Sequence, residues 1–182
     1  KFLNFKKFVN FTSVWENYDG VKNNPANLYA VQKIAFGNLM RFYRTKDKNI
    51  KYYNLYLSQT FGNDDNRKKL FNILKQNYRN SKITNLASSN FYMNVLNVKD
   101  VVVAVNILIN KNIKSENFGL LNNGNTNILR LITKFNNNKE KKIKYNFLSH
   151  KIIKEKNIKY KKLPGWKPKN SSLNDILKYI EN

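Results

Sequence analysis

Tyr29 and Lys33 are the residues whose types and spacing point most directly to chemistry. On a helix, positions i and i+4 lie on one face, so the two side chains can meet. A nearby ammonium group favours the phenolate form of a tyrosine, and such a tyrosine can act as a general acid or base at a sugar hydroxyl or carbonyl. The pair is therefore a candidate catalytic pair.

The spacing alone is weak support. Tyr18/Lys22 and Tyr78/Lys82 share it, as expected by chance in a chain with 11 tyrosines and many lysines. Only the secondary structure predicted around each pair can therefore indicate which of the three is catalytic.

The segment before Tyr29 predicts a strand, a polar loop and a helix. Phe5 to Thr12 is an apolar run typical of a buried strand. A loop with Gly20 and Pro25 follows. Leu28 to Arg44 then predicts a helix, with apolar residues on one face at helical spacing: Leu28, Val31, Ala35, Leu39 and Phe42. The pair would lie at the start of this helix.

Further elements alternate along the rest of the chain. Strands are predicted at Ile50 to Leu57, Lys82 to Leu86, Phe91 to Val95, Phe118 to Leu121 and Lys142 to Phe147. Helices are predicted at Lys68 to Tyr78 (Leu70, Ile73 and Leu74 inward), Val98 to Ile109, Thr126 to Phe135 and Leu173 to Glu181, the last opened by a capping box of Ser172 and Asp175. The order is typical of an α/β protein whose early strands are parallel and joined by crossover helices.

The stretch from Phe8 to Phe36, FVNFTSVWENYDGVKNNPANLYAVQKIAF, resembles the extended short-chain dehydrogenase/reductases, specifically the NAD-dependent nucleotide-sugar epimerases and dehydratases. In that family a strand ends in Ser or Thr, and a Pro-containing loop leads to the Tyr-x-x-x-Lys helix. The resemblance implies that Tyr29 is the acid/base and that Lys33 supports it and contacts the nicotinamide ribose. Ser13 is the expected hydroxyl residue, with Thr12 as its rival; capping of the strand end is an alternative role for both.

Later segments continue the resemblance. Leu55 to Leu74 is similar to the family's strand and Gly-Pro turn, with Asn63 at the usual proline, and it implies that Leu57 and Ser58 lie near the nicotinamide. Arg67 is a candidate for the phosphates of a sugar nucleotide, since arginine binds them bidentately, although a solvated arginine at a helix start is equally consistent. Lys154 is a second candidate, standing where relatives often use arginine.

The most specific match is LPGWKP at Leu163 to Pro168. It resembles the family's C-terminal Leu-Gly-Trp-x-Pro signature, in a form similar to members of the CDP-abequose synthase type. A second family segment is similar to Phe91 to Val105, FYMNVLNVKDVVVAV, and Asp100 stands at the position of that segment's aspartate. The resemblance implies a structural role for the LPGWKP turn.

One family feature is missing from this sequence. The glycine-rich fingerprint that binds the cofactor pyrophosphate normally lies roughly a hundred residues before the tyrosine. None of the 6 glycines forms it, and only 28 residues precede Tyr29. With Lys at position 1 as well, we expect the natural protein to begin further upstream and this chain alone to be inactive.

Composition narrows the alternatives. There is no Cys and one His, which excludes disulfides and a multi-histidine metal site, so no metal is expected. The longest apolar run is too short to span a bilayer, which favours a cytoplasmic protein. The net charge of +23 indicates either a nucleic-acid or anionic-membrane partner or a compositional bias toward Lys, Asn, Ile, Tyr and Phe. The even spread of lysines favours the bias.

These observations predict the C-terminal part of a Rossmann-type doubly wound sheet, residues 1–62, and a small mixed α/β substrate-binding domain, residues 63–182, with some return to the sheet. The expected function is a fragment of an NAD- or NADP-dependent epimerase, dehydratase or 4-keto reductase acting on a nucleotide-linked sugar, in a family that is often dimeric. A basic nucleic-acid-binding or assembly protein derived from this fold, and a catalytically dead remnant, are the alternatives.

Overall fold

The structure is a computed structural model and describes residues 5–63, 65, 67–137 and 139–182. Asp64 and Asn66, which belong to the segment from Leu55 to Leu74 discussed above, lie outside these residues. The chain divides into two compact units. Unit 1 contains residues 1–58, 101–121 and 156–167, and unit 2 contains residues 59–100, 122–155 and 168–182.

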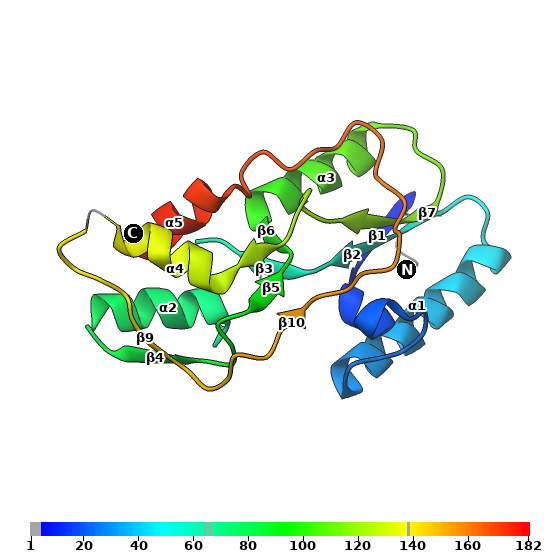
Figure 1. The fold of residues 1–182 in the computed structure, drawn as a ribbon. Coiled ribbons are helices and arrows are strands. Elements are labelled where there is room, and N and C mark those ends of the chain that lie inside the picture. Colours follow the sequence, from blue (N-terminus) through cyan, green and yellow to red (C-terminus); the bar gives the residue numbers. More distant parts are fainter. Residues whose placement is uncertain (1–4, 64, 66, 138) are drawn as a thin grey trace. The chain divides into compact units, whose positions relative to one another are not determined.

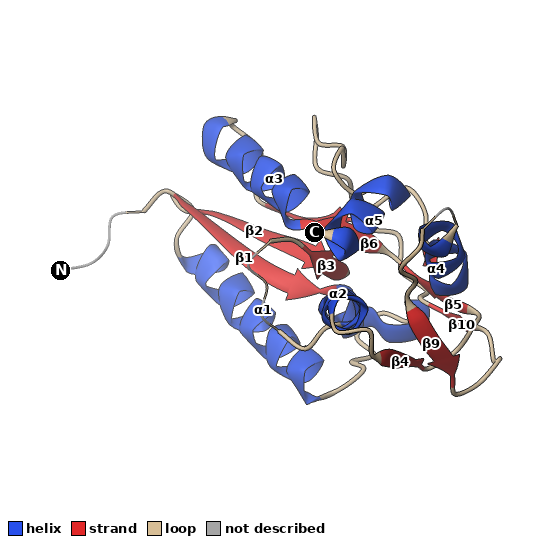
Figure 2. Cartoon of the chain, turned by 90° about the vertical axis from the view of Figure 1, so that its left-hand side faces the viewer, coloured by secondary structure: helices blue, strands red, loops and turns tan. Residues whose placement is uncertain are grey.

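Unit 1 is built on a parallel sheet. Its elements are β1 (Lys7–Ser13), the 3-10 helix η1 (Val14–Gly20), α1 (Leu28–Lys46), β2 (Lys51–Leu57), most of α3 (Val98–Asn110) and β7 (Glu116–Leu120). The strand order is β1-β2-β7, and both pairings are parallel, which confirms the predicted parallel α/β arrangement. Figure 2 shows α1 and α3 on opposite faces of this sheet.

The two faces of this sheet differ in character. The face toward α3 is an apolar core that includes Tyr53, Leu55, Phe118 and Leu120, each at most 1% exposed. The other face carries an asparagine ladder across all three strands. Asn10 Nδ2 donates to Asn54 Oδ1 at 2.9 Å, and Asn54 Nδ2 donates to Asn117 Oδ1 at 2.8 Å. The ladder follows the strand register, which pairs these three residues.

Helix α1 lies over this polar face, and its apolar stripe is exposed. Amphipathic spacing usually marks the buried side of a helix, yet Leu28, Val31, Leu39 and Phe42 are between 45% and 71% exposed. The residues that α1 buries are Ala30 and Met40. The helix therefore turns its smaller and polar side toward the sheet.

Unit 2 holds the remaining elements around a second core. They are β3 (Gln59–Phe61), α2 (Leu70–Arg79), β4 (Ile83–Leu86), β5 (Phe91–Met93), β6 (Val95–Asn97), β8 (Thr126–Asn127), α4 (Ile128–Asn136), β9 (Lys144–Phe147), β10 (Ile153–Lys154) and α5 (Leu173–Glu181). They form the sheets β10-β5-β8, β3-β6 and β4-β9. Helices α2, α4 and α5 gather beside them in Figure 1, and the core draws on all three helices, for example through Leu74, Leu131 and Ile180, each fully buried.

Two details of unit 2 differ from the sequence predictions. The single strand predicted from Phe91 to Val95 is divided at Asn94, whose side chain accepts a hydrogen bond from Asn122 N at 2.9 Å and donates to Asn122 O at 3.0 Å. In α2, Phe71 rather than Ile73 lies inward beside Leu74; Ile73 is 36% exposed. The capping box of Ser172 and Asp175 is confirmed at the start of α5.

Candidate active site

The pair Tyr29 and Lys33 lies in the first turns of α1. Asn27 caps the helix, since its Oδ1 accepts a hydrogen bond from Ala30 N at 3.0 Å. Lys33 Nζ lies 5.6 Å from the centroid of the Tyr29 ring and donates to the carbonyl oxygen of Phe11 at 2.8 Å. This hydrogen bond joins the lysine to the end of β1, while Tyr29 remains 49% exposed.

The topology explains why the pair lies at that end of the sheet. Because β1 and β2 are parallel and α1 connects them, α1 begins next to the carboxyl end of β1. Ligands in open parallel sheets bind outside the carboxyl ends of the strands. Thr12 and Ser13 end β1, and Leu57 ends β2 in register with Ser13. The predicted residues Thr12, Ser13, Tyr29, Lys33 and Leu57 therefore belong to one end of unit 1, and Ser58 follows directly.

Ser13 and Thr12 have different environments. Ser13 caps η1: its Oγ accepts a hydrogen bond from Trp15 N at 3.2 Å, and Glu16 Oε1 accepts one from Ser13 N at 3.5 Å. Capping uses the Ser13 hydroxyl as an acceptor and leaves its O–H able to donate. Thr12 is 4% exposed, and its Oγ1 has no hydrogen-bond partner among the described residues. Buried hydroxyls are normally partnered, so Thr12 is the more unusual of the two.

Glu16 is a residue of this site that sequence reasoning missed. It is 6% exposed, and burial raises the pKa of its carboxyl above the ordinary 4.5, against the opposing effects of the Ser13 backbone, the Tyr56 hydroxyl and the charge of Lys33. Burial and the Glu16 carboxyl in turn raise the pKa of Tyr56 to about 12. The signal was present in the sequence, because Ser13 and Glu16 have the spacing of a capping box.

The other two tyrosine–lysine pairs do not share this setting. Tyr18 lies in η1 with φ −56° and ψ 145°, which is not helical, so it and Lys22 do not face each other on a helix. Tyr78 is near the end of α2, and Lys82 lies beyond that end. Lys141, rather than Lys82, lies over the Tyr78 ring, at 5.0 Å. Of the three pairs, only Tyr29/Lys33 lies on a single helix.

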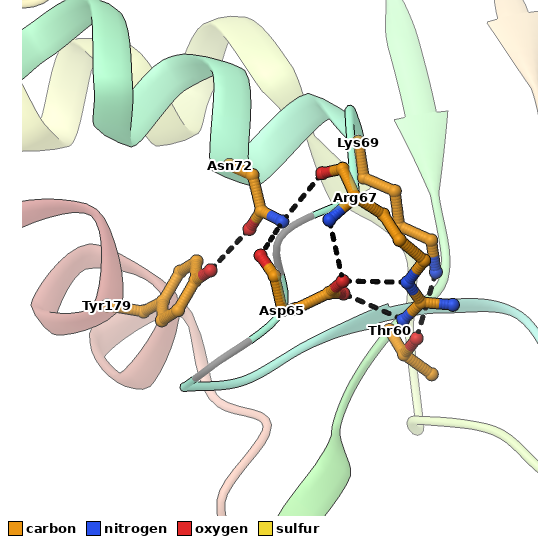
Figure 3. Close-up of polar contacts among 6 residues, drawn as sticks. All are labelled: Thr60, Asp65, Arg67, Lys69, Asn72 and Tyr179. Carbon is orange, nitrogen blue, oxygen red and sulfur yellow. Dashed lines mark hydrogen bonds and ion pairs between the residues drawn. The ribbon is translucent and has the colours of Figure 1, made fainter.

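Arg67 belongs to a polar cluster in unit 2 (Figure 3). Its Nε and Nη2 donate to the two carboxylate oxygens of Asp65, each at 2.7 Å, and the hydrogen bond from Arg67 lowers the pKa of Asp65. Asn72 holds the backbone of Asp65 and Arg67 in place, because its Nδ2 donates to the Arg67 carbonyl at 2.8 Å and to the Asp65 carbonyl. Tyr179 donates to the Asn72 Oδ1.

Lys69 brings a second cation to the same place. Its Nζ donates to Thr60 Oγ1 at 3.2 Å, and Figure 3 shows its ammonium near the guanidinium of Arg67. Burial, followed by the charge of Arg67, lowers the pKa of Lys69. The cluster thus brings the two cations Arg67 and Lys69 close to the Asp65 carboxylate.

Lys154, the other predicted phosphate residue, is exposed on β10, in register with Tyr92 of β5. The polar cluster of Figure 3 contains Arg67 but not Lys154. In the described part of the chain, no group of three or more His, Cys, Asp or Glu residues could hold a metal ion. Nor is any helix there both long and apolar enough to cross a bilayer.

With this fold and site, the chain belongs to the NAD dependent epimerase/dehydratase family, whose family model matches residues 7–124. The mixed α/β fold with a Rossmann-type parallel sheet is shared with solved enzymes of that kind.

Three solved structures illustrate the likeness. UDP-glucose 4-epimerase from Thermotoga maritima, with UDP-glucose, has a TM-score of 0.77 and 17% identity over 97% of this chain and 63% of its own. UDP-glucuronic acid 4-epimerase from Bacillus cereus, with UDP-glucuronic acid and NAD, has a TM-score of 0.77 and 17% identity, covering 97% of this chain and 60% of its own. dTDP-glucose 4,6-dehydratase from Bacillus anthracis, with NAD, has a TM-score of 0.77 and 15% identity, covering 96% of this chain and 60% of its own.

The chain therefore spans about 60% of the length of these structures. No curated protein sequence matches it significantly.

Proposed function

We propose that this chain supplies the acid/base pair and part of the substrate-binding surface of an NAD- or NADP-dependent enzyme that acts on a nucleotide-linked sugar. The observation that carries the proposal is the placement of Tyr29 and Lys33 on one helix, with Lys33 hydrogen-bonded to the end of β1. The neighbouring Thr12 hydroxyl is buried and has no hydrogen-bond partner within the part of the chain that the structure describes. Epimerase, dehydratase and 4-keto reductase chemistry all use such a pair.

In this proposal each residue has a defined task. Tyr29 gives a proton to, or takes one from, the oxygen of the reacting sugar carbon, because it is the exposed member of the pair. Lys33 stabilises the phenolate. Thr12 or Ser13 donates a hydrogen bond to the same sugar oxygen and holds it in place.

A nicotinamide cofactor is compatible with these residues on its ribose and nicotinamide side. The Thr12 Oγ1 supports this proposal as a hydrogen-bonding group at the end of β1 that has no partner among the described residues. In the bound state Lys33 would contact the ribose, and Leu57 and Ser58 would lie beside the nicotinamide. The cofactor, when bound, supplies the hydride chemistry. The glycine-rich fingerprint for its pyrophosphate does not occur in this sequence, so the complete enzyme requires it from elsewhere.

For the substrate, we propose that the diphosphate of the nucleotide sugar binds at the cluster of Arg67 and Lys69. Two neighbouring cations, one of them partly buried, favour a group with more than one negative oxygen. Lys154 is kept as a second, separate candidate for a phosphate contact.

A dimer of two such chains is also part of the proposal. It is supported by the exposed apolar stripe of α1, where Leu28 and Phe42 are 71% and 54% exposed. Sedimentation measurements would show whether the enzyme is dimeric.

The test of the function is turnover in the complete enzyme. We expect UDP-, CDP-, GDP- or dTDP-linked sugars to be converted in the presence of NAD or NADP, and Lys33→Met to reduce turnover strongly while Lys22→Met, its control, does not. Loss of activity in both variants alike, or in neither, would refute the role given to Lys33.

A further inference from the structure

A basic hollow lies at the opposite end of the sheet in unit 1. It has a volume of about 470 Å³ and is lined by seven residues. Four are cations: Arg44, Lys48, Lys51 and Lys114. The remaining lining residues are Ile50, Asn112 and Ser115. The lining thus combines four positive charges with a hydroxyl and an amide, and no carboxylate is among the described lining residues.

The walls of the hollow are held by hydrogen bonds. On one side, α1 ends at Lys46 and the chain turns into β2. On the other, Ser115 Oγ accepts a hydrogen bond from Tyr52 N at 3.1 Å, and the Tyr53 hydroxyl donates to the Ile113 carbonyl at 2.7 Å. Lys51 Nζ donates to Asn112 Oδ1. The segment before β7 is therefore fixed against the start of β2, which holds Lys114 at the edge of the hollow.

Two acidic residues adjoin the lining residues in the sequence, Glu116 after Ser115 and Asp47 before Lys48. Glu116 accepts a hydrogen bond from Lys161 Nζ at 2.8 Å, which lowers the pKa of its carboxyl, with smaller contributions from the Asn117 backbone and the charge of Arg44. Asp47 Oδ1 accepts one from Asn49 N at 2.9 Å. Four cations facing one hollow repel one another, and a bound anion would offset that repulsion.

We propose that this hollow is a binding site for a compact polyphosphate anion, either inorganic or part of a small molecule. Arginine and lysine side chains with a hydroxyl and an amide are the donors that bind phosphate oxygens. A concave hollow of this size suits a short phosphate chain, whereas a nucleic-acid backbone requires an extended row of cations.

The site is separate from the proposed active site. It lies at the amino ends of β2 and β7, while Ser13 and Tyr29 lie at the carboxyl end of the same parallel sheet. β2 has seven residues, and a strand rises about 3.3 Å per residue, so the two ends are roughly 20 Å apart. The inference therefore does not depend on the proposed function.

The experiment is calorimetric titration of the full chain with inorganic tripolyphosphate at physiological salt. We expect one site, and we expect binding to weaken at least about tenfold in the double variant Lys48→Gln/Lys114→Gln, because hydrogen bonds to charged groups contribute that much or more. The control, Lys99→Gln/Lys178→Gln, removes the same charge from exposed lysines of unit 2 and should change affinity less than about twofold.

The position of the bound anion can be checked by nuclear magnetic resonance. The backbone amide signals of Tyr52 and Ser115 should shift when tripolyphosphate is added to the native chain, and they should not shift in the Lys48→Gln/Lys114→Gln variant. Absence of binding, or an equal loss in the control, would overturn the proposal. So would tighter binding of a single-stranded RNA oligonucleotide than of tripolyphosphate with the same dependence on Lys48 and Lys114, since that result would assign the hollow to nucleic acid.

Discussion

Asp100 is the buried charge on which the C-terminal segment of unit 2 depends. Its side chain is 1% exposed. It accepts hydrogen bonds from Lys169 N at 3.0 Å, from Asn170 N at 3.0 Å, from Asn170 Nδ2 at 2.9 Å and from Ser171 Oγ at 2.5 Å. Desolvation opposes ionisation, but these hydrogen bonds outweigh it and lower the pKa of Asp100 below 3.8.

Asp100→Asn should destabilise the protein markedly. The amide keeps one acceptor oxygen and places an N–H₂ group against donors, so at least two hydrogen bonds to a charged group are lost. At about 1.5 kcal/mol each, the free energy of unfolding should fall by about 3 kcal/mol. The melting temperature should fall by roughly 10 °C. Urea and thermal unfolding followed by circular dichroism measure both.

The stability that Asp100 contributes should depend on pH. Because the folded pKa of Asp100 lies below the unfolded value, its contribution is complete above the unfolded pKa and is lost as pH falls through the folded pKa. The difference between wild type and Asp100→Asn should therefore shrink under acid conditions. Asp19→Asn, at an exposed ion pair with Lys156, is the control and should cost less than about 1 kcal/mol. A near-neutral Asp100→Asn, or a pH-independent difference, would refute the reasoning.

Two further predictions concern unit 1. Burial raises the pKa of Glu16, so the free energy of unfolding of the wild type should fall as pH rises from 4.5 through the folded pKa. Glu16→Gln should lack that fall when urea unfolding is measured at a series of pH values. Parallel plots of unfolding free energy against pH for the two proteins would contradict this prediction. A Cβ at Gly119 would lie 2.4 Å from the Tyr160 Cβ, so Gly119→Ala should cost about 1–3 kcal/mol in thermal unfolding. Gly124→Ala, where nothing lies within 4 Å, should be near neutral, and equal effects would show that the Tyr160 contact is unimportant.

Much of the fold could be predicted because local signals are strong where packing does not override them. Helix α5 follows from its capping box at Ser172, and β1 and β2 follow from runs of apolar residues. The division at Asn94 could not be predicted, because it depends on hydrogen bonds to Asn122, 28 residues away. The orientation of α1 was also hidden, since its apolar stripe does not reveal that the sheet beneath it carries an asparagine ladder.

For the site, the sequence placed Tyr29, Lys33, Thr12 and Ser13 at one end of a sheet, and their catalytic roles remain predictions. Lys69 was missed because its significance depends on a contact with Thr60, nine residues earlier, which no spacing rule indicates.

Four of the lysines in this chain of net charge +23 have local structural roles. Lys7 and Lys141 donate to backbone carbonyls: Lys7 to Leu108 at 2.8 Å and Lys141 to Arg79 at 2.8 Å. Lys156 and Lys161 pair with Asp19 and Glu116. These local roles are spread over both units.

Tyr29 is the residue proposed to perform the proton transfer. The most direct measurement is turnover of a nucleotide-linked sugar by the complete enzyme carrying Tyr29→Phe, which removes only a hydroxyl from a half-exposed ring. Turnover should fall on the order of 10²–10⁴-fold, while Tyr18→Phe and Tyr78→Phe, which have the same spacing to a lysine without a shared helix, should stay close to wild type. Near-normal turnover in Tyr29→Phe, or an equal loss in either control, would contradict the account.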